Sequence, residues 1–264
     1  MLLADRVAIV TGGANGIGRA IALKFASEGC TLAIADIDLF QGTRTADEAR
    51  KFGQEALSLK CDSTNYREVE TCVKKVLDKF GRVDILVNNA GGMSAAPPLE
   101  EMEEELWDKI VDLNLKSNFL FCKYLVPHMK ARKYGKIINI SSLGAINPPK
   151  HAIHYNSAKA GVIGFTYDLA YALAPYNINV NVILPGLIQT AFYDKLVGLG
   201  SQEQKDGFFA ALGKMAPMGR IGTPEDIAGA ALFLASGLSS YVTGTSLLVT
   251  GGMPLAPQAP PSTG

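Results

Sequence analysis

The chain has 264 residues, 48% of them apolar, which is enough for one large domain with a substantial core. Its 25 basic and 25 acidic side chains cancel, and no basic stripe alternates with aromatic residues, so nucleic acid is not an expected partner. No stretch approaches the roughly 20 apolar residues of a membrane span, and the first predicted strand leaves no room for a signal peptide. Four cysteines without a C-x-x-C pair indicate a reduced, cytoplasmic protein, and the three histidines lack metal-ligand spacing.

The first predicted elements are a strand, a glycine-rich turn and a helix. Residues 6–11 form an apolar, β-branched run of strand length. Glycines follow at positions 12, 16 and 18, and apolar residues then recur at helical spacing until Gly29, which can cap the helix. Glycine allows a close approach to pyrophosphate, and a helix N-terminus attracts negative charge. This order predicts a dinucleotide site, although the spacing Gly-x-x-x-Gly-x-Gly differs from the commoner Gly-x-Gly-x-x-Gly.

The second predicted strand, residues 31–36, ends at Asp36, eighteen residues after the last glycine of the turn. A carboxylate at this place can accept hydrogen bonds from the adenosine ribose hydroxyls and would repel a 2′-phosphate. Neither of the next two residues is basic, and Asn15 within the turn is uncharged. These residues favour NAD over NADP. The alternative is that Asp36 only shapes the turn after its strand.

Strands and helices continue to alternate along the chain. The remaining predicted strands span residues 55–60, 83–88, 135–141, 178–184 and 246–249, and the stretches between them have helical length and periodicity. Such alternation predicts a parallel, doubly wound sheet with right-handed crossovers. We therefore predict an α/β, single-domain Rossmann fold over residues 1–252, with a seven-stranded parallel sheet and helices on both faces. The Pro-rich tail, residues 253–264, is expected to be loose or to lie on a neighbouring subunit.

A hydroxyl, a phenol and an ammonium group follow the fifth predicted strand, at Ser142, Tyr155 and Lys159. Tyr155 and Lys159 are four residues apart and would share one helix face. A strand end beside a helix start can place all three groups around one substrate oxygen. An isolated pair of this kind is usually a half-buried tyrosine beside a solvated lysine. The predicted nucleotide site favours the catalytic interpretation.

With these features together, the sequence resembles the short-chain dehydrogenase/reductase family from about Asp5 to Gly252. Five motifs match in order and separation, namely TGGANGIG at 11–18, NNAG at 88–91, Asn114, the set Ser142, Tyr155 and Lys159, and Pro185-Gly186 with Thr190 beyond. The thirteen-residue offset to Tyr155 selects Ser142 over the neighbouring Ser141. Ser63 replaces a residue that is commonly apolar in the family.

The resemblance implies an NAD-dependent alcohol dehydrogenase or ketone reductase. Tyr155 would be the general acid/base, with its pKa lowered by the Lys159 ammonium and by oxidised nicotinamide. Ser142 would orient the substrate oxygen, and Asn114 would hold a water in a proton path. The implied catalytic residues are Asn114, Ser142, Tyr155 and Lys159. The implied cofactor-binding residues are Gly12, Asn15, Gly16, Ile17, Gly18, Asp36, Ile37, Asp62, Ser63, Asn89, Ala90, Gly91, Tyr155, Lys159, Pro185, Gly186, Ile188 and Thr190.

The sequence defines the substrate less closely. A segment at about 190–223 resembles the family's substrate lid, and its apolar residues would cover a ligand or pack a helix equally well. Mostly neutral groups favour a cyclic or aryl secondary alcohol or ketone. Lysines at 150, 195 and 214 keep open a 3-oxoacyl thioester of acyl-carrier protein or coenzyme A, and a non-catalytic NAD-binding regulator is a further alternative. The candidate substrate residues are Ser142, Gly144, Asn147, Phe192, Tyr193 and His154, the last of which is as readily a solvated loop residue.

The resemblance also implies a homotetramer, or at least a dimer. The family pairs the long helices predicted at 103–132 and 155–175 across one two-fold axis, and residues 224–250 often form a second interface. The segment FTYDLAYALAPY carries the apolar and aromatic residues that such a surface would bury. A helix facing its own sheet would show much the same composition.

Overall fold

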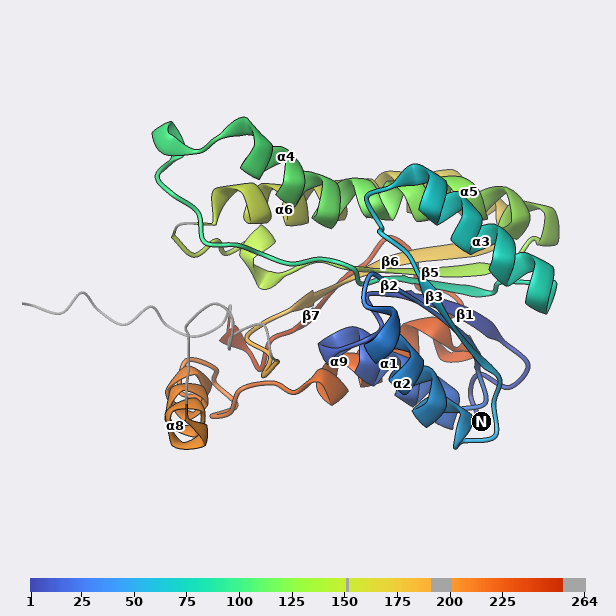
Figure 1. The fold of residues 1–264 in the computed structure, drawn as a ribbon, viewed down its shortest axis with the longest axis horizontal. Coiled ribbons are helices and arrows are strands. Elements are labelled where there is room, and N and C mark those ends of the chain that lie inside the picture. Colours follow the sequence, from blue (N-terminus) through green and yellow to red (C-terminus); the bar gives the residue numbers. More distant parts are fainter. Residues whose placement is uncertain (151, 191–200, 254–264) are drawn as a thin grey trace, which may run out of the picture.

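The computed structural model describes residues 1–150, 152–190 and 201–253. Within them, seven parallel strands form one sheet in the order β3-β2-β1-β4-β5-β6-β7 (Figure 1). This arrangement confirms the predicted fold class. The strands are β1 (Val7–Thr11), β2 (Thr31–Asp36), β3 (Ala56–Lys60), β4 (Ile85–Asn88), β5 (Gly135–Ile140), β6 (Ile178–Pro185) and β7 (Ser246–Val249).

Helices cover both faces of the sheet (Figure 1). One face carries α1 (Gly16–Ser27), α2 (Leu39–Arg50) and α9 (Pro224–Ala235). The other carries α3 (Tyr66–Phe80), α4 (Glu104–Val111), α5 (Ser117–Arg132) and α6 (Ile153–Leu173). Helix α8 (Gln202–Gly213) lies apart from both layers, beyond the carboxyl end of β7.

The strand order determines where a ligand can bind. The chain moves outward from β1 through β2 to β3 and then returns to the other side of β1 at β4. The loops that leave β1 and β4 therefore diverge to opposite faces of the sheet at its carboxyl edge. In open parallel sheets, ligands bind in the crevice at such a switch point. The glycine turn and the NNAG segment leave from these two strands.

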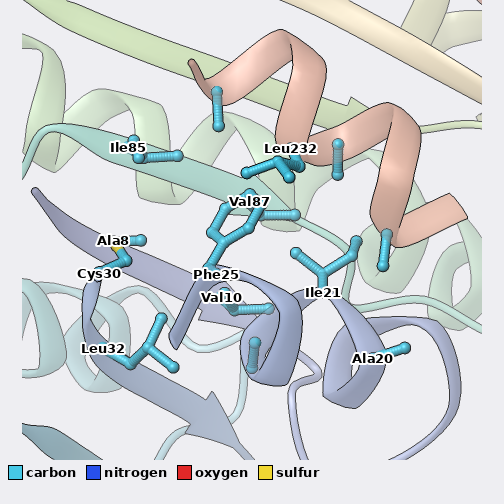
Figure 2. Close-up of a cluster of buried hydrophobic side chains, with 14 of the residues drawn as sticks. Ala8, Val10, Ala20, Ile21, Phe25, Cys30, Leu32, Ile85, Val87 and Leu232 are labelled. Atoms are coloured by element: carbon cyan, nitrogen blue, oxygen red, sulfur yellow. The ribbon is translucent and has the colours of Figure 1, made fainter. Parts of the chain in front are cut away.

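The core on the α1 side is built around one aromatic ring. Phe25 of α1 is completely buried, with Val10 and Leu32 of the sheet and Leu232 of α9 in the same cluster (Figure 2). Full burial of a phenylalanine stabilises a fold by about 1.5–3 kcal/mol. Because α1 packs against both the sheet and the neighbouring helix α9, the glycine turn at its start has a rigid support.

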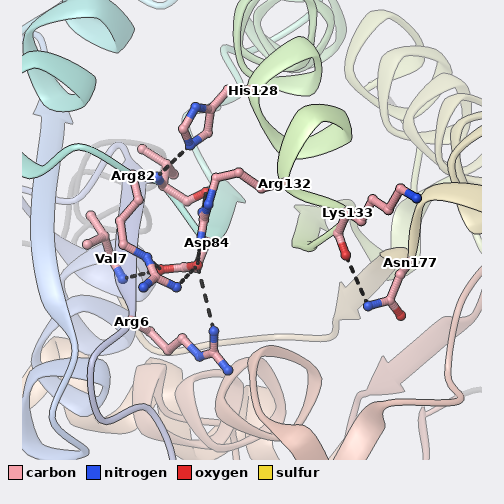
Figure 3. Close-up of polar contacts among 9 residues, drawn as sticks. Arg6, Val7, Arg82, Asp84, His128, Arg132, Lys133 and Asn177 are labelled. Carbon is pink, nitrogen blue, oxygen red and sulfur yellow. Dashed lines mark hydrogen bonds and ion pairs between the residues drawn. The ribbon is translucent and has the colours of Figure 1, made fainter.

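The amino edge of the sheet holds a buried ion cluster around Asp84, just before β4 (Figure 3). Its carboxylate accepts hydrogen bonds from the Val7 N–H at 3.0 Å, from Arg82 at 2.6 and 2.8 Å, and from Arg132 at 3.1 Å. Arg6 adds an ion pair at 3.7 Å. Burial opposes ionisation of Asp84, but hydrogen bonds from Arg82 and Val7 outweigh it and lower its pKa. The cluster ties β1 and β4 together at the edge opposite the switch point.

Candidate active site

Three positions of the turn after β1 require glycine. Gly12 and Gly16 have φ of 60° and 53°, in the left-handed region that side chains disfavour. Gly18 has ordinary angles, but a Cβ there would lie 2.1 Å from the main-chain oxygen of Gly12 and 2.5 Å from the side-chain nitrogen of Asn89. The turn therefore packs backbone against backbone at the start of α1. This close cradle fits a dinucleotide pyrophosphate.

The side chain of Asn89 supports the turn from beneath. Its amide donates to the main-chain oxygens of Thr11 and Gly12, both at 3.0 Å. In return, the Thr11 hydroxyl accepts the N–H groups of Asn89 at 3.0 Å and Ala90 at 2.9 Å. The side-chain amide of Asn89 is therefore engaged with the turn, and its role in binding the cofactor stays a prediction. Thr11 is not among the predicted site residues. The signal that could have indicated its role is a threonine at the end of an otherwise apolar strand.

Asp36 and Asp62 lie at the ends of neighbouring strands. Both oxygens of Asp36 accept main-chain N–H groups, one from Ala14 in the glycine turn and one from Asp38, each at 2.9 Å. This carboxylate is therefore fixed against the turn. Asp62 accepts two hydrogen bonds from Thr64, at 2.7 and 2.9 Å. Beside these two carboxylates, Ile37 is exposed and Ser63 is buried.

The loop after β6 brings the last predicted cofactor residues to the same place. A Cβ on Gly16 would lie 3.5 Å from the Cγ2 of Thr190, so Thr190 lies next to the glycine turn. Gly186, after Pro185, has no room for a side chain because a Cβ would lie 2.9 Å from the Cα of Thr250. Ile188 is buried and its backbone bridges to Gly222. The structure thus joins segments that are about 170 positions apart in the chain.

The three predicted catalytic groups meet where β5 ends and α6 begins. Ser142 accepts the N–H of Gly144 at 3.1 Å, and its hydroxyl is near enough to the Tyr155 phenol to act on the pKa of that phenol. Burial raises the pKa of Tyr155, and the Ser142 hydroxyl partly offsets that rise. The chain alone therefore does not show the lowered Tyr155 pKa that the family resemblance implies.

Lys159 lies one helical turn beyond Tyr155, with its ammonium buried. The Nζ atom donates to the main-chain oxygen of Ile140 at 2.8 Å and lies 5.7 Å from the centre of the Tyr155 ring. Burial lowers the pKa of Lys159 to about 8. The amine is therefore still mostly protonated at neutral pH and adds positive charge beside the phenol.

Asn114 lies in a π-helical turn, Asp112–Lys116, between α4 and α5. Its amide donates to the main-chain oxygens of Gly92 at 2.7 Å and Ile110 at 2.9 Å, and its oxygen accepts the N–H of Gly92 at 3.1 Å. A Cβ on Gly91 would lie 2.7 Å from the Asn114 oxygen and 3.1 Å from the Lys159 Nζ. Asn114 and Lys159 therefore meet at Gly91. The water-holding role of Asn114 stays a prediction.

Comparison with known proteins agrees with this arrangement. A family model described as enoyl-(acyl carrier protein) reductase matches residues 12–254. The BbsD subunit of (2S)-[(R)-hydroxy(phenyl)methyl]succinyl-CoA dehydrogenase from Thauera aromatica is 42% identical, covering 97% of this chain and 99% of that protein. Cyclohexanol dehydrogenase from Rhodococcus sp. (strain TK6) is 35% identical, with 95% and 97% covered.

The chain belongs to the short-chain dehydrogenase/reductase family. A solved short-chain dehydrogenase/reductase from Burkholderia xenovorans, whose function is named only provisionally, superimposes with a TM-score of 0.90 at 36% identity, covering 97% of this chain and 99% of that one. Membership makes the protein an oxidoreductase that acts on alcohols or ketones with a nicotinamide dinucleotide.

The candidate substrate residues of this short-chain dehydrogenase differ in their surroundings. His154 is completely buried in the first turn of α6, and its Nδ1 accepts the N–H of Tyr155 at 2.9 Å, so the solvated-loop alternative is wrong. Gly144 faces Asn156, whose oxygen would lie 2.5 Å from an added Cβ. Asn147 is exposed. Phe192 and Tyr193 lie outside the described residues.

Metal and membrane features were searched over the same part of the chain. Among the residues that the structure describes, no three His, Cys, Asp or Glu side chains are grouped so as to hold a metal ion. No helix in the described ranges is both long and apolar enough to span a bilayer.

Proposed function

We propose that this protein is a cytoplasmic, NAD-dependent dehydrogenase of a neutral secondary alcohol, or the reductase of its ketone, with a cyclic or aryl substrate. The observation that carries the proposal is the Lys159 ammonium 5.7 Å from the centre of the Tyr155 ring, one helical turn along α6, with Ser142 directly after β5 and near enough to the phenol to act on its pKa. This group of side chains stands at the same sheet edge as the glycine cradle. Proton transfer and cofactor binding are therefore assigned to adjoining parts of one crevice.

The preference for NAD rests on Asp36. Its carboxylate is held by the N–H groups of Ala14 and Asp38, so it cannot easily turn away from the glycine turn. A negative charge fixed there disfavours the 2′-phosphate of NADP and can accept hydrogen bonds from ribose hydroxyls. Asp62 and Ile37 would complete the adenosine side, and Ile188 and Thr190 would lie toward the nicotinamide carboxamide.

In the proposed mechanism, Tyr155 removes the proton of the substrate hydroxyl during oxidation and returns it during reduction. Ser142 orients the substrate oxygen through its own hydroxyl. The Lys159 ammonium favours the phenolate of Tyr155 and thereby opposes the effect of burial on the pKa of that phenol. The bound nicotinamide would supply the hydride acceptor or donor. Asn114 would keep Gly91 against Lys159 and complete a path for protons.

The substrate class is supported by the similar proteins. By their names, cyclohexanol dehydrogenase acts on a cyclic alcohol, and BbsD is part of a dehydrogenase of a phenyl-substituted hydroxyl compound. A 3-oxoacyl thioester is the second candidate, because BbsD belongs to a dehydrogenase of a succinyl-CoA compound and the matching family model is described by an acyl-carrier-protein substrate. A neutral alcohol is preferred because the hollow beside Gly144 is lined by uncharged residues, among them Pro149 and Asn156.

A homotetramer is proposed as the working assembly. Three aromatic side chains, Phe119 of α5 and Tyr167 and Tyr171 of α6, are exposed on the outer helical layer. Phe233 of α9 and Leu248 of β7 are exposed on a second surface. Two apolar surfaces on one chain are what a dimer of dimers requires. A monomer in light scattering at micromolar concentration would refute this assembly.

The first test is an absorbance assay of NADH and NADPH formation. Cyclic, aryl and aliphatic secondary alcohols, their ketones and 3-oxoacyl thioesters are each offered with both cofactors. We expect turnover with NAD, and we expect Tyr155→Phe to lower kcat by at least about 100-fold while the Kd for NAD stays within about threefold. Preference for NADPH and a thioester would support the second candidate. Binding of NAD without turnover of any compound would point to a regulatory protein.

A further inference from the structure

The last residues of β5 and the loop that follows hold Lys159 at several points. The Ser141 hydroxyl donates to the main-chain oxygen of Lys159 at 2.7 Å. On one side of it, the oxygen of Ile140 accepts the Nζ of the same lysine. On the other side, Ser142 acts on the pKa of the Tyr155 phenol. Two consecutive residues of the strand end, Ile140 and Ser141, therefore contact both ends of the lysine, and the next residue acts on the phenol.

We infer that Ser141 is a positioning residue for the proposed proton transfer, acting through the backbone of Lys159. The inference rests on the proposed function of Tyr155 and Lys159. Ser141 is itself buried, and its hydroxyl is engaged with the helix. It fixes how far α6 lies along β5, and thus where the ammonium stands relative to the phenol.

The bond from Ser141 is not needed to satisfy the helix. A carbonyl within an α-helix already accepts the N–H of the residue four positions later. The oxygen of Lys159 has a second lone pair, and Ser141 occupies it as an additional donor. Removing the hydroxyl therefore leaves no carbonyl of α6 unpaired. The main consequence would be freedom of the helix to shift against the strand, with a modest loss of stability.

A second tie between the same elements provides a matched comparison. Asn139 lies two residues before Ser141 and so on the same face of β5. Its amide donates at 2.9 Å to the hydroxyl of Thr166, seven residues after Lys159 on α6. This tie is also buried, but it lies two helical turns from the lysine. If any loss of a buried hydroxyl disturbed the site, both ties would matter equally for catalysis.

The direction of the effect follows from electrostatics. The titratable residue nearest in the sequence to the pair Tyr155 and Lys159 is His154, and its side chain is buried. If Lys159 moves away, the phenolate loses stabilisation and the apparent pKa of Tyr155 rises. A rise of about one unit would lower kcat/KM for the alcohol about tenfold at neutral pH. At alkaline pH the difference would disappear, since the phenol is then ionised in both proteins.

The experiment compares the wild type, Ser141→Ala and Thr166→Val from about pH 6 to about pH 10.5, using the best alcohol from the screen. For Ser141→Ala we expect a kcat/KM about tenfold lower at pH 7, convergence with the wild type at high pH, and a small change in Tm. Thr166→Val should lower Tm and leave the midpoint of the pH profile unchanged. A Ser141→Ala profile that matches the wild type, or that falls by one factor at every pH, would overturn the inference.

A measurement without turnover separates this inference from the proposed function. If the wild type oxidises no alcohol, the proposed function fails. The titration of Lys159 is then followed by NMR of labelled lysine side chains, with Lys159→Arg to assign the signal. A changed titration midpoint in Ser141→Ala, but not in Thr166→Val, would still support the positioning role. An unchanged midpoint would refute it.

Discussion

Replacement of Asp84 by asparagine tests whether the ion cluster at the amino edge of the sheet is a net source of stability. Asp84 is completely buried and accepts one main-chain and three guanidinium hydrogen bonds. Loss of one partner from a buried ion pair destabilises a protein by about 3–5 kcal/mol. The three arginines here are about one-third exposed, so water can solvate part of the freed charge. We therefore expect a loss of about 2–4 kcal/mol.

For a chain of this length, that loss corresponds to a fall in Tm of about 5–15 °C, measured by circular dichroism at one protein concentration. Asp78→Asn is the control, because Asp78 forms an exposed pair with Lys74 and should change Tm by less than about 2 °C. The pKa of Asp84 is lowered on folding, so its contribution is complete above the unfolded carboxyl pKa and fades as pH falls further. The difference between wild type and Asp84→Asn should therefore shrink below about pH 4. A change in Tm as small as that of the control would refute the reasoning.

Two further predictions concern the cofactor cradle and a buried lysine. Gly18→Ala should abolish detectable NAD binding in calorimetry, because its Cβ would lie 2.1 Å from the Gly12 oxygen; Gly229→Ala, with open space around its Cβ, should instead raise stability by about 0.5–1 kcal/mol. Equal NAD affinity in both variants would contradict this account. Lys136 is buried, with its Nζ near Ser239 at 3.3 and 3.5 Å, and burial lowers its pKa to about 8. The folded state thus binds fewer protons than the unfolded state between about pH 8 and 10, so this lysine makes stability rise with pH there. Lys136→Met should raise Tm at pH 7 and flatten that rise. If urea denaturation showed the free energy of unfolding rising equally with pH in both proteins, this account would be contradicted.

The strands and the glycine turn were predictable because their signals are local. Strands buried on both faces appear as continuous β-branched, apolar runs, and the predicted bounds differ from the observed ones by two residues at most. The turn was predictable because Gly12 and Gly16 adopt angles that few other residues tolerate. Asp36 was placed correctly at the end of β2, beside the turn.

The contacts that hold the site together were not predictable, because they join distant parts of the chain. The bonds between Asn89 and Thr11 connect residues 78 positions apart, and the bond from Ser141 to Lys159 spans 18. The helix predicted at 103–132 is interrupted by a π-helical turn at Asn114. There the Asn114 side chain donates to the Ile110 oxygen, which in an α-helix would receive the main-chain N–H of Asn114 itself.

Strand β4 has a consequence for how this protein can diversify. Asp84 precedes its first residue, and Asn89 follows its last, so the ion cluster and the support of the cofactor turn occupy opposite ends of one short strand. The described residues that would meet a substrate, such as Ser142 and Gly144, follow the carboxyl end of β5 and take no part in the ion cluster. Substitutions that alter substrate choice can therefore accumulate there without loosening the other edge. An evolving lineage could exchange one alcohol for another while its melting behaviour stays nearly constant, and laboratory selection for new substrates should find the same freedom.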